Sequence, residues 1–203
     1  RGELDPVTNT VRSSGSKEDA LYDLEPEYIT LSADSKTAYV TLQENNAVAV
    51  VDIVAHKVTA VKALGLKDYN DPANALDVQS NGAIQLETVP FKGMYMPDGA
   101  ASYTVNGKTY ILTANEGDAS EFRVNATKIG ALKGSLDPNS EAYKFLKDTT
   151  AYDAIEVAGD MGNGGIYMYG GRSFSIWNAD SMDQVYDSGN DFENITAQRV
   201  PDY

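Results

Sequence analysis

The sequence predicts an all-β protein, a partial β-propeller of about three four-stranded antiparallel blades with long inter-blade loops and one short inserted helix. The first observation is an internal repeat: residues 26–45 and 97–116 align without a gap, and Tyr39 matches Tyr110 at an offset of 71 residues. Each copy is typical of a β-hairpin, with a polar turn before a strand rich in Tyr, Val, Ile and Thr. The second observation is spacing, because two more short strands follow the first hairpin and four fit into about forty residues, the size of one blade.

The repeat sets the expected domain boundaries. We expect an exposed lead-in over residues 1–22 and the partial propeller over residues 23–203. Its blades are expected at residues 26–64, 92–130 and 152–190, with the start of a further blade at 192–203. The third blade is suggested by residues 174–178, which resemble residues 48–52 in the third strand of the first blade. The inserted helix is expected within residues 137–147.

Three blades do not close a propeller, because closed propellers have about four to eight. An open arc leaves strand edges unpaired, which proteins avoid. We therefore expect further blades, supplied by the parent polypeptide or by other chains, and self-assembly is one way to supply them. The opening residues contain neither an initiator Met nor an apolar signal core, which fits an internal or processed fragment.

The chain is strongly acidic, with 30 Asp and Glu against 16 Lys and Arg and a net charge of −14. Such a surface disfavours nucleic acid, whose phosphates need clustered Lys and Arg. It favours cations, although an acidic surface also serves solubility alone. No stretch of about 20 apolar residues predicts a transmembrane segment. The chain has no cysteine, and its one histidine, His56, is expected in an exposed turn, so neither a Ser-His-Asp site nor a His or thiolate zinc centre is expected.

The first candidate site is a cation site at the mouth of the propeller channel. Glu25, Glu27 and Asp98 fall at the starts of the expected innermost strands, and equivalent positions in successive blades converge on the propeller axis. Carboxylates held together repel one another unless a cation lies between them, and oxygen ligands alone suit Ca²⁺ or Mg²⁺. The alternative is that these acids cap turns or face solvent.

The second candidate is the loop of Asn115, Glu116 and Asp118, in which oxygen-bearing side chains surround a glycine at a strand end. This pattern suits either a calcium loop or a recurring polar turn, since residues 44–46 stand at the same place in the first copy. Arg172, which follows two glycines, is a candidate ligand for a phosphate or carboxylate. The alternative for Arg172 is that it locks adjacent blades together.

Five segments, in order along the chain, resemble the choice-of-anchor I family: residues 23–29, 39–46, 92–98, 112–118 and 170–177. This family is related to mesenchyme-specific cell-surface glycoproteins and to atypical alkaline-phosphatase-like propellers. The resemblance implies a secreted or surface-anchored propeller, either extracellular, on the cell surface or periplasmic, and longer than this chain. It implies little about activity, because a shared fold does not transfer function.

We therefore expect a structural or binding module that associates with Ca²⁺ and is completed by further blades. The alternative hypothesis is a calcium-dependent phosphoesterase resembling alkaline phosphatase. In that case an ion held by Glu27 and Asp98 would bind a phosphate and activate water. The residues do not decide whether the chain is an enzyme.

Overall fold

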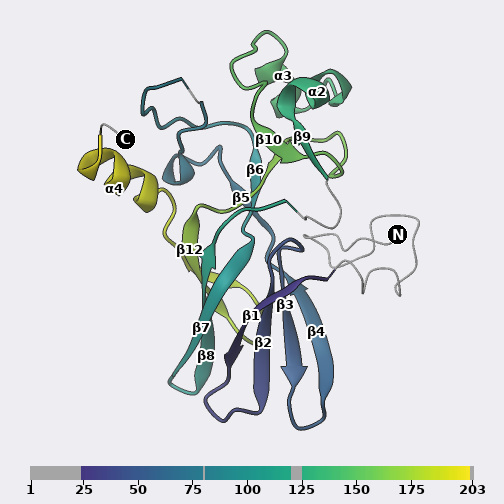
Figure 1. The fold of residues 1–203 in the computed structure, drawn as a ribbon, viewed down its shortest axis with the longest axis vertical. Coiled ribbons are helices and arrows are strands. Elements are labelled where there is room, and N and C mark those ends of the chain that lie inside the picture. Colours follow the sequence, from purple (N-terminus) through teal and green to yellow (C-terminus); the bar gives the residue numbers. More distant parts are fainter. Residues whose placement is uncertain (1–23, 80, 120–124, 202–203) are drawn as a thin grey trace. The chain divides into compact units, whose positions relative to one another are not determined.

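The computed structural model describes residues 24–79, 81–119 and 125–201 (Figure 1). The chain divides into two compact units, each assembled from several stretches of sequence. Among the described residues, the first unit comprises residues 24–66, 94–118 and 170–188, and the second comprises the described residues of 67–93, 119–169 and 189–201. The expected lead-in, residues 1–22, lies outside the described residues.

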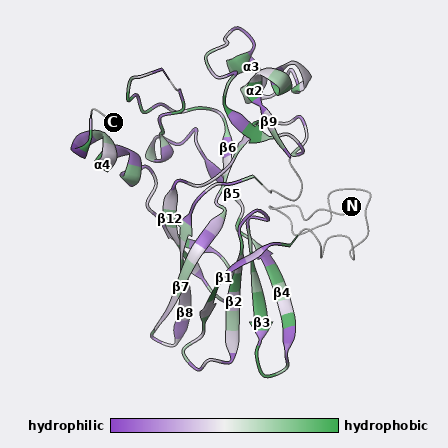
Figure 2. Cartoon of the chain, in the orientation of Figure 1, coloured by the Kyte–Doolittle hydropathy of each residue, from purple (hydrophilic) through white to green (hydrophobic). Residues whose placement is uncertain are grey.

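The first unit begins with an antiparallel sheet in the order β1-β2-β3-β4, at the residues expected for the first blade. Its strands are Pro26–Leu31, Thr37–Leu42, Ala47–Asp52 and Lys57–Ala63. The turns are tight, because Ser35, Asn46 and His56 all adopt positive φ, a conformation that is uncommon outside glycine. His56 is exposed in its turn, as the sequence predicts. Hydrophobic residues predominate along β3 and β4 (Figure 2).

The second sheet of this unit combines strands that we expected in two different blades. In the order β7-β8-β12-β13, its strands are Pro97–Val105, Lys108–Asn115, Ser173–Asn178 and Gln184–Asp187. The strands at 173–178 and 184–187 therefore complete the second blade and do not form a separate third blade over 152–190. The β12 strand resembles the third strand of the first blade because it is the third strand of the second. Loop-closure entropy rises slowly with length, so the sheet accommodates residues 116–172 between β8 and β12.

The two hairpins of the repeat differ in register by two residues. Tyr39 pairs with Thr30, but its counterpart Tyr110 pairs with Tyr103, two positions beyond the ungapped match. The turn is shorter in the second hairpin, which accounts for the shift. Side chains alternate with a period of two, so an even shift leaves the same set of residues on each face. Equivalent faces of the two blades can therefore be compared directly.

The two sheets of the first unit pack against each other. Tyr39 of the first blade shares one buried cluster with Ile111 and Trp177 of the second. Both Ile111 and Trp177 are almost completely buried. The innermost strands are also linked, because the Thr41 hydroxyl donates to the Asp98 carbonyl at 2.9 Å. Burying side chains of this size contributes about 1.5–3 kcal/mol each, so the cluster is a main source of this unit's stability.

The second unit contains small sheets and short helices. A three-stranded sheet in the order β11-β6-β5, which lies largely in this unit, joins Tyr167–Met168, Lys92–Met94 and Leu66–Asp68. The helical elements are η1 (Pro72–Asn74), α2 (Ile129–Leu132), η2 (Lys133–Ser135), α3 (Glu141–Leu146) and α4 (Asp191–Arg199). The β9 strand (Ala126–Lys128) pairs with β10 (Glu156–Ala158), so it does not join the second blade that we expected to reach residue 130.

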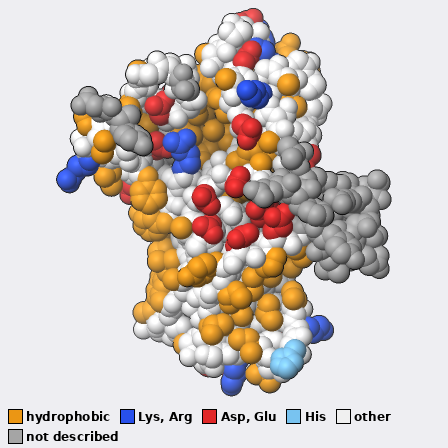
Figure 3. Space-filling model, in the orientation of Figure 1, with side chains coloured by type: hydrophobic (Ala, Val, Ile, Leu, Met, Phe, Trp, Pro, Cys, Tyr) orange, Lys and Arg blue, Asp and Glu red, His pale blue; other side chains and the backbone are white. Residues whose placement is uncertain are grey.

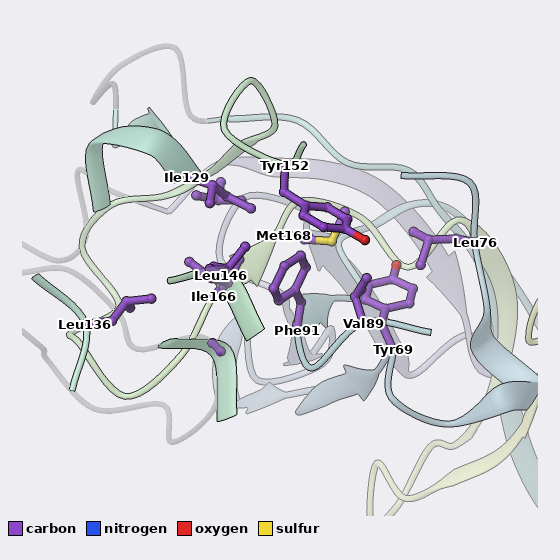
Figure 4. Close-up of a cluster of buried hydrophobic side chains, with 12 residues drawn as sticks. Tyr69, Leu76, Val89, Phe91, Ile129, Leu136, Leu146, Tyr152, Ile166 and Met168 are labelled. Carbon is purple, nitrogen blue, oxygen red and sulfur yellow. The ribbon is translucent and has the colours of Figure 1, made fainter. Parts of the chain in front are cut away.

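The second unit has a hydrophobic core of its own. Figure 4 shows Phe91, Tyr152 and Met168 among the side chains that meet in it. The rings of Phe91 and Tyr152 meet edge to face with centroids 6.0 Å apart, an arrangement that aromatic pairs favour. The four-stranded antiparallel sheets of the first unit, with few helices in the described chain, confirm the all-β class.

Two helices test the expectations for helical segments. The α3 helix lies within the expected range 137–147, and the Ser140 side chain caps it by accepting the Tyr143 N–H at 3.1 Å. The expected start of a further blade over residues 192–203 is wrong, because the α4 helix occupies most of this segment. Acidic Asp191 and Glu193 in its first turn and Arg199 in its last complement the helix dipole. These end charges favour a helix over the strand that Ile and Thr at 195–196 suggested.

Candidate functional site

Four acidic side chains from both blades interact at one end of the first unit's sheets. Glu25 precedes β1 and Glu27 lies in it, Glu44 occupies the turn between β2 and β3, and Asp118 follows β8. Glu25 and Glu44 are half-buried, whereas Glu27 and Asp118 are exposed. We call these four residues the acidic rim. Figure 3 shows acidic side chains gathered in the middle of the view.

Buried hydrogen bonds fix the turn that carries Glu44. The Asn46 N–H donates to the Gln43 carbonyl at 2.9 Å and closes the turn. The Asn46 side chain is fully buried, and its Oδ1 accepts the Met96 N–H at 3.0 Å. Its Nδ2 donates to the Gly65 carbonyl at 2.6 Å. The position of Glu44 is therefore set by contacts with the end of the first blade and with the segment that leads into the second.

Glu44 is the electrostatically unusual residue of the rim. Burial raises the pKa of its carboxyl to about 7, and the negative charges of Glu25, Glu27 and Asp118 raise it further. One of its oxygens, Oε2, is buried and receives no hydrogen bond from the described residues. The backbone N–H of Glu44 itself donates to the carboxyl and partly offsets these effects, but burial and the three neighbouring charges outweigh it, so the ionised form is costly in this position. Glu44 therefore holds its proton more readily than an ordinary glutamate does, because its pKa is raised to about 7.

The three candidate ligands at the end of β8 and in the loop after it, Asn115, Glu116 and Asp118, have different surroundings. Glu116 is exposed, and its Oε2 accepts the Gln43 Nε2–H at 2.9 Å. Asp118 is exposed, and its negative charge raises the pKa of Glu44. Asn115, by contrast, is only 6% exposed. The structure therefore brings Asp118 to the rim, ties Glu116 to the Glu44 turn through Gln43, and turns Asn115 inward.

Asn115 belongs to a buried chain of hydrogen bonds. The Trp177 Nε1–H donates to Thr113 Oγ1 at 2.9 Å, and the Thr113 hydroxyl donates to Asn115 Oδ1 at 2.8 Å. Asn115 Nδ2 then donates to Ser175 Oγ at 2.7 Å, and the Ser175 hydroxyl donates to Asp187 Oδ2 at 2.6 Å. Buried polar groups that are satisfied in this way specify a unique packing. The sequence pattern did not distinguish this role of Asn115 from a rim ligand.

The segment with Arg172 packs closely on the same loop. Gly170 has a φ of 84°, and a Cβ atom there would lie well under 3.0 Å from the Glu116 carbonyl oxygen. The Gly171 N–H donates to the Tyr95 carbonyl at 3.1 Å. Only glycine fits at position 170, because both the backbone conformation and the space exclude a side chain. Arg172 itself is exposed, and its binding of an anion stays a prediction.

The remaining sequence candidate, Asp98, is half-buried at the start of β7. In the part of the chain that the structure describes, no group of three or more His, Cys, Asp or Glu side chains is arranged to hold a metal ion. The donor chemistry of the rim nevertheless suits calcium, since it supplies only oxygen atoms. A bound cation would require the exposed side chains of Glu27 and Asp118 to turn toward Glu44.

Glu44 is the residue whose importance the sequence indicated least clearly. It lies 71 residues before Asn115, so the internal repeat aligns the two residues. That alignment favoured a recurring polar turn at Glu44 and gave no sign of its unusual pKa. Its neighbours in the rim come from two other stretches of the chain. No local pattern contains that information, so only the folded arrangement reveals the centre of the rim.

The fold and the rim together define a class, an all-β module of antiparallel blades with a carboxylate-rich end. The chain belongs to the choice-of-anchor I domain family, whose model matches residues 4–203. Choice-of-anchor domains are associated with cell-surface proteins. No curated protein and no solved structure significantly matches the chain. Among the described residues, no helix has the length and apolar character needed to cross a bilayer.

Proposed function

We propose that this chain is a non-enzymatic structural and binding module of a cell-surface protein, whose acidic rim associates with Ca²⁺ and whose sheets are completed by further blades. The observation that carries the calcium proposal is the buried Oε2 of Glu44, which receives no hydrogen bond from the described residues, in a carboxyl that interacts with three other carboxylates. Membership of the choice-of-anchor I family supports the surface location. The net charge of −14 favours cation binding in general.

The choice of calcium follows from the irregularity of the rim. A divalent cation would give Glu44 Oε2 a partner and offset the repulsion among the carboxylates. Calcium accepts about six to eight oxygen ligands in flexible arrangements, whereas magnesium demands a near-ideal octahedron and releases its water reluctantly. Side chains that arrive from separate loops and differ in exposure suit the more tolerant ion. Partly exposed ligands also suit the weak affinities of extracellular modules, with Kd values of about 10⁻⁴–10⁻³ M.

Calorimetric titration of the chain with CaCl₂ tests this proposal. We expect binding by the unaltered chain and at least about fivefold weaker binding by Glu44→Gln, which keeps the shape of the side chain and removes its charge. Glu141→Gln is the matched control, because Glu141 is an exposed acid at the start of α3 and outside the rim. Equal calcium affinity in Glu44→Gln and the unaltered chain would exclude the rim as the site.

The same proteins test the phosphoesterase alternative. We expect no calcium-dependent hydrolysis of a phosphomonoester by the purified chain. Turnover that requires Ca²⁺ and falls in Glu27→Gln and Asp98→Asn would overturn the non-enzymatic assignment. Calcium-dependent turnover that stays with the purified chain but is unaffected by both substitutions would also overturn the non-enzymatic assignment, and it would place the reaction away from Glu27 and Asp98.

A further inference from the structure

The outer side of the first blade exposes an apolar surface, which we call the aliphatic face. It consists of Ile29, Leu31, Val40, Val51, Val58 and Val61, of which Val40 and Val61 also pack against a small buried cluster of Leu42, Ala47 and Ala49 on the same side of the sheet. The ladder places these side chains together, because Ile29 pairs with Val40 and Val51 pairs with Val58, and cross-strand partners share a face. Ile29 is 59% exposed and Val58 is 54% exposed. Figure 3 shows hydrophobic side chains spread over this sheet.

The second blade exposes a different apolar surface on its own outer side, which we call the aromatic face. It consists of Tyr103, Tyr110, Leu112, Phe174, Ile176 and Tyr186. The rings of Tyr103 and Tyr110 stack with centroids 5.3 Å apart, and those of Phe174 and Tyr186 lie 5.6 Å apart. Tyr186 is 45% exposed. Two apolar faces of this extent on one unit are typical of interaction surfaces.

The internal repeat indicates which surface each face accepts. Val40 of the aliphatic face corresponds to Ile111 in the second blade, and Ile111 is buried against the first blade. Tyr110 of the aromatic face corresponds to Tyr39, which is buried in that same contact. Within the chain, therefore, the Tyr39 side of one blade packs on the Ile111 side of the next. Repeating this contact would bring an aromatic face onto an aliphatic face.

We propose that the occupant of the aliphatic face is the aromatic face of a second copy of this chain, so that copies associate head to tail. This inference rests on the proposed function in one respect, that further blades complete the sheets. Both partners of the contact are present on one chain, and none of the residues that form the two faces is charged. Although the chain has a net charge of −14, the contact between the two faces would not bring like charges directly together.

The geometry sets the expected strength and size of the assembly. Four strands at about 4.8 Å spacing and six residues at about 3.3 Å each give a face of roughly 400 Å² in projection. Two such faces, with the relief of their side chains, bury about 1,000 Å², near the lower limit for a specific interface, so association should depend on concentration. A head-to-tail contact forms a ring where its rotation closes. With two blades per copy, about two to four copies would supply the four to eight blades of a propeller.

Mixing two complementary variants tests the head-to-tail arrangement. One carries Ile29→Lys and Val58→Lys on the aliphatic face, and the other carries Tyr103→Lys and Tyr186→Lys on the aromatic face. All four positions are at least 42% exposed, and retained Trp177 fluorescence would confirm that the variants fold. Light scattering after size exclusion should show oligomers for the unaltered chain, monomers for each variant alone, and a 1:1 dimer when the variants are mixed. Val54→Lys, in the turn after β3 and 72% exposed, is the control and should assemble normally.

Three outcomes would overturn the proposal. An unaltered chain that stays monomeric at all concentrations would mean that its own residues or another protein cover the aliphatic face. Self-association of one double variant as strong as that of the unaltered chain would mean that like faces pair. A mixture that forms no dimer would refute the contact even if the unaltered chain self-associates in another way.

Disulfide trapping provides a second measurement that does not depend on the lysine variants. The chain has no cysteine, so Val58→Cys and Tyr186→Cys each introduce a single thiol. After mixing equal amounts and mild oxidation, the mixed disulfide should exceed each homodimer by clearly more than the twofold excess that random pairing gives, and a 1:2:1 ratio would contradict the head-to-tail contact. Calcium titration of the monomeric lysine variants keeps the two proposals apart. Calcium binding without dimers would refute only the assembly, whereas dimers without calcium binding would refute only the rim site.

Discussion

Replacing Asn115 with alanine removes the centre of the hydrogen-bond chain that begins at Trp177. The Asn115 side chain accepts from Thr113 at 2.8 Å and donates to Ser173 at 3.1 Å and to Ser175 at 2.7 Å. Each such bond contributes about 0.5–1.5 kcal/mol net, and its partners would be left buried without a replacement. We therefore expect Asn115→Ala to lower the free energy of unfolding of the first unit by about 2–4 kcal/mol.

The chain carries its own reporter for this measurement. Trp177 is the single tryptophan, and it is 1% exposed in the core of the first unit. Urea unfolding followed by its fluorescence should show a lower midpoint for Asn115→Ala. The neighbouring Glu116→Ala is the control, because Glu116 is exposed and should lose no more than about 1 kcal/mol.

The result also separates the two interpretations of Asn115. If the substitution left the urea midpoint unchanged, the hydrogen bonds from Trp177 through Asn115 to Ser175 would not stabilise the first unit. That result would refute the predicted loss of stability. If it left stability unchanged and abolished calcium binding, Asn115 would be a ligand, as the sequence pattern allowed. A loss of stability with calcium binding retained would assign Asn115 to the core.

Two further substitutions test the rim and its support. The pKa of Glu44 is raised from 4.5 to about 7 in the folded state, so folding becomes less favourable as pH rises through that window. Relative to the unaltered chain, Glu44→Gln should therefore gain about 1 kcal/mol between pH 5 and pH 8, after allowance for solvent screening, and a pH-independent difference in urea unfolding would contradict this. Gly170→Ala should destabilise the first unit by more than about 2 kcal/mol, because its Cβ would meet the Glu116 carbonyl. Gly65→Ala has a similar φ of 77° but open space, so it should lose only about 1 kcal/mol; equal losses in thermal unfolding would show that contact with Glu116 is unimportant.

The sequence predicted the hairpins well because their information is local. Alternating apolar residues and a tight turn lie within about twenty residues, and both copies of the repeat contain them. The β12 strand shows where this ends. Its pattern identified it as a third strand, but its partner β8 ends at Asn115, far back in the chain. Sequence proximity favoured a separate blade, whereas hydrogen bonding across the residue 116–172 insertion determines the actual sheet.

The candidate site likewise combines features that local sequence predicts with features that depend on residues distant in the chain. Glu25, Glu27 and Asp118 were found from their positions at strand ends, and the folded chain brings all three within electrostatic reach of Glu44. Asn115 has the same position-based signal, but it turns into the core because Ser175 and Thr113 offer it buried partners. Strand-end position alone therefore cannot separate a rim ligand from a core residue, because the direction of the side chain depends on partners distant in sequence.

The rim and the contact between blades are parts of one structural arrangement. Asn46 holds the turn of Glu44 to Met96, which leads into the second blade, and Asp118 reaches the rim from the end of β8. The raised pKa of Glu44 thus requires both blades to be packed. Carboxyl NMR titration of Glu44 should therefore report on blade packing as well as on calcium. Loosening the core through Asn115→Ala should lower that pKa toward 4.5, whereas an unshifted pKa would show that the rim keeps its form without the core.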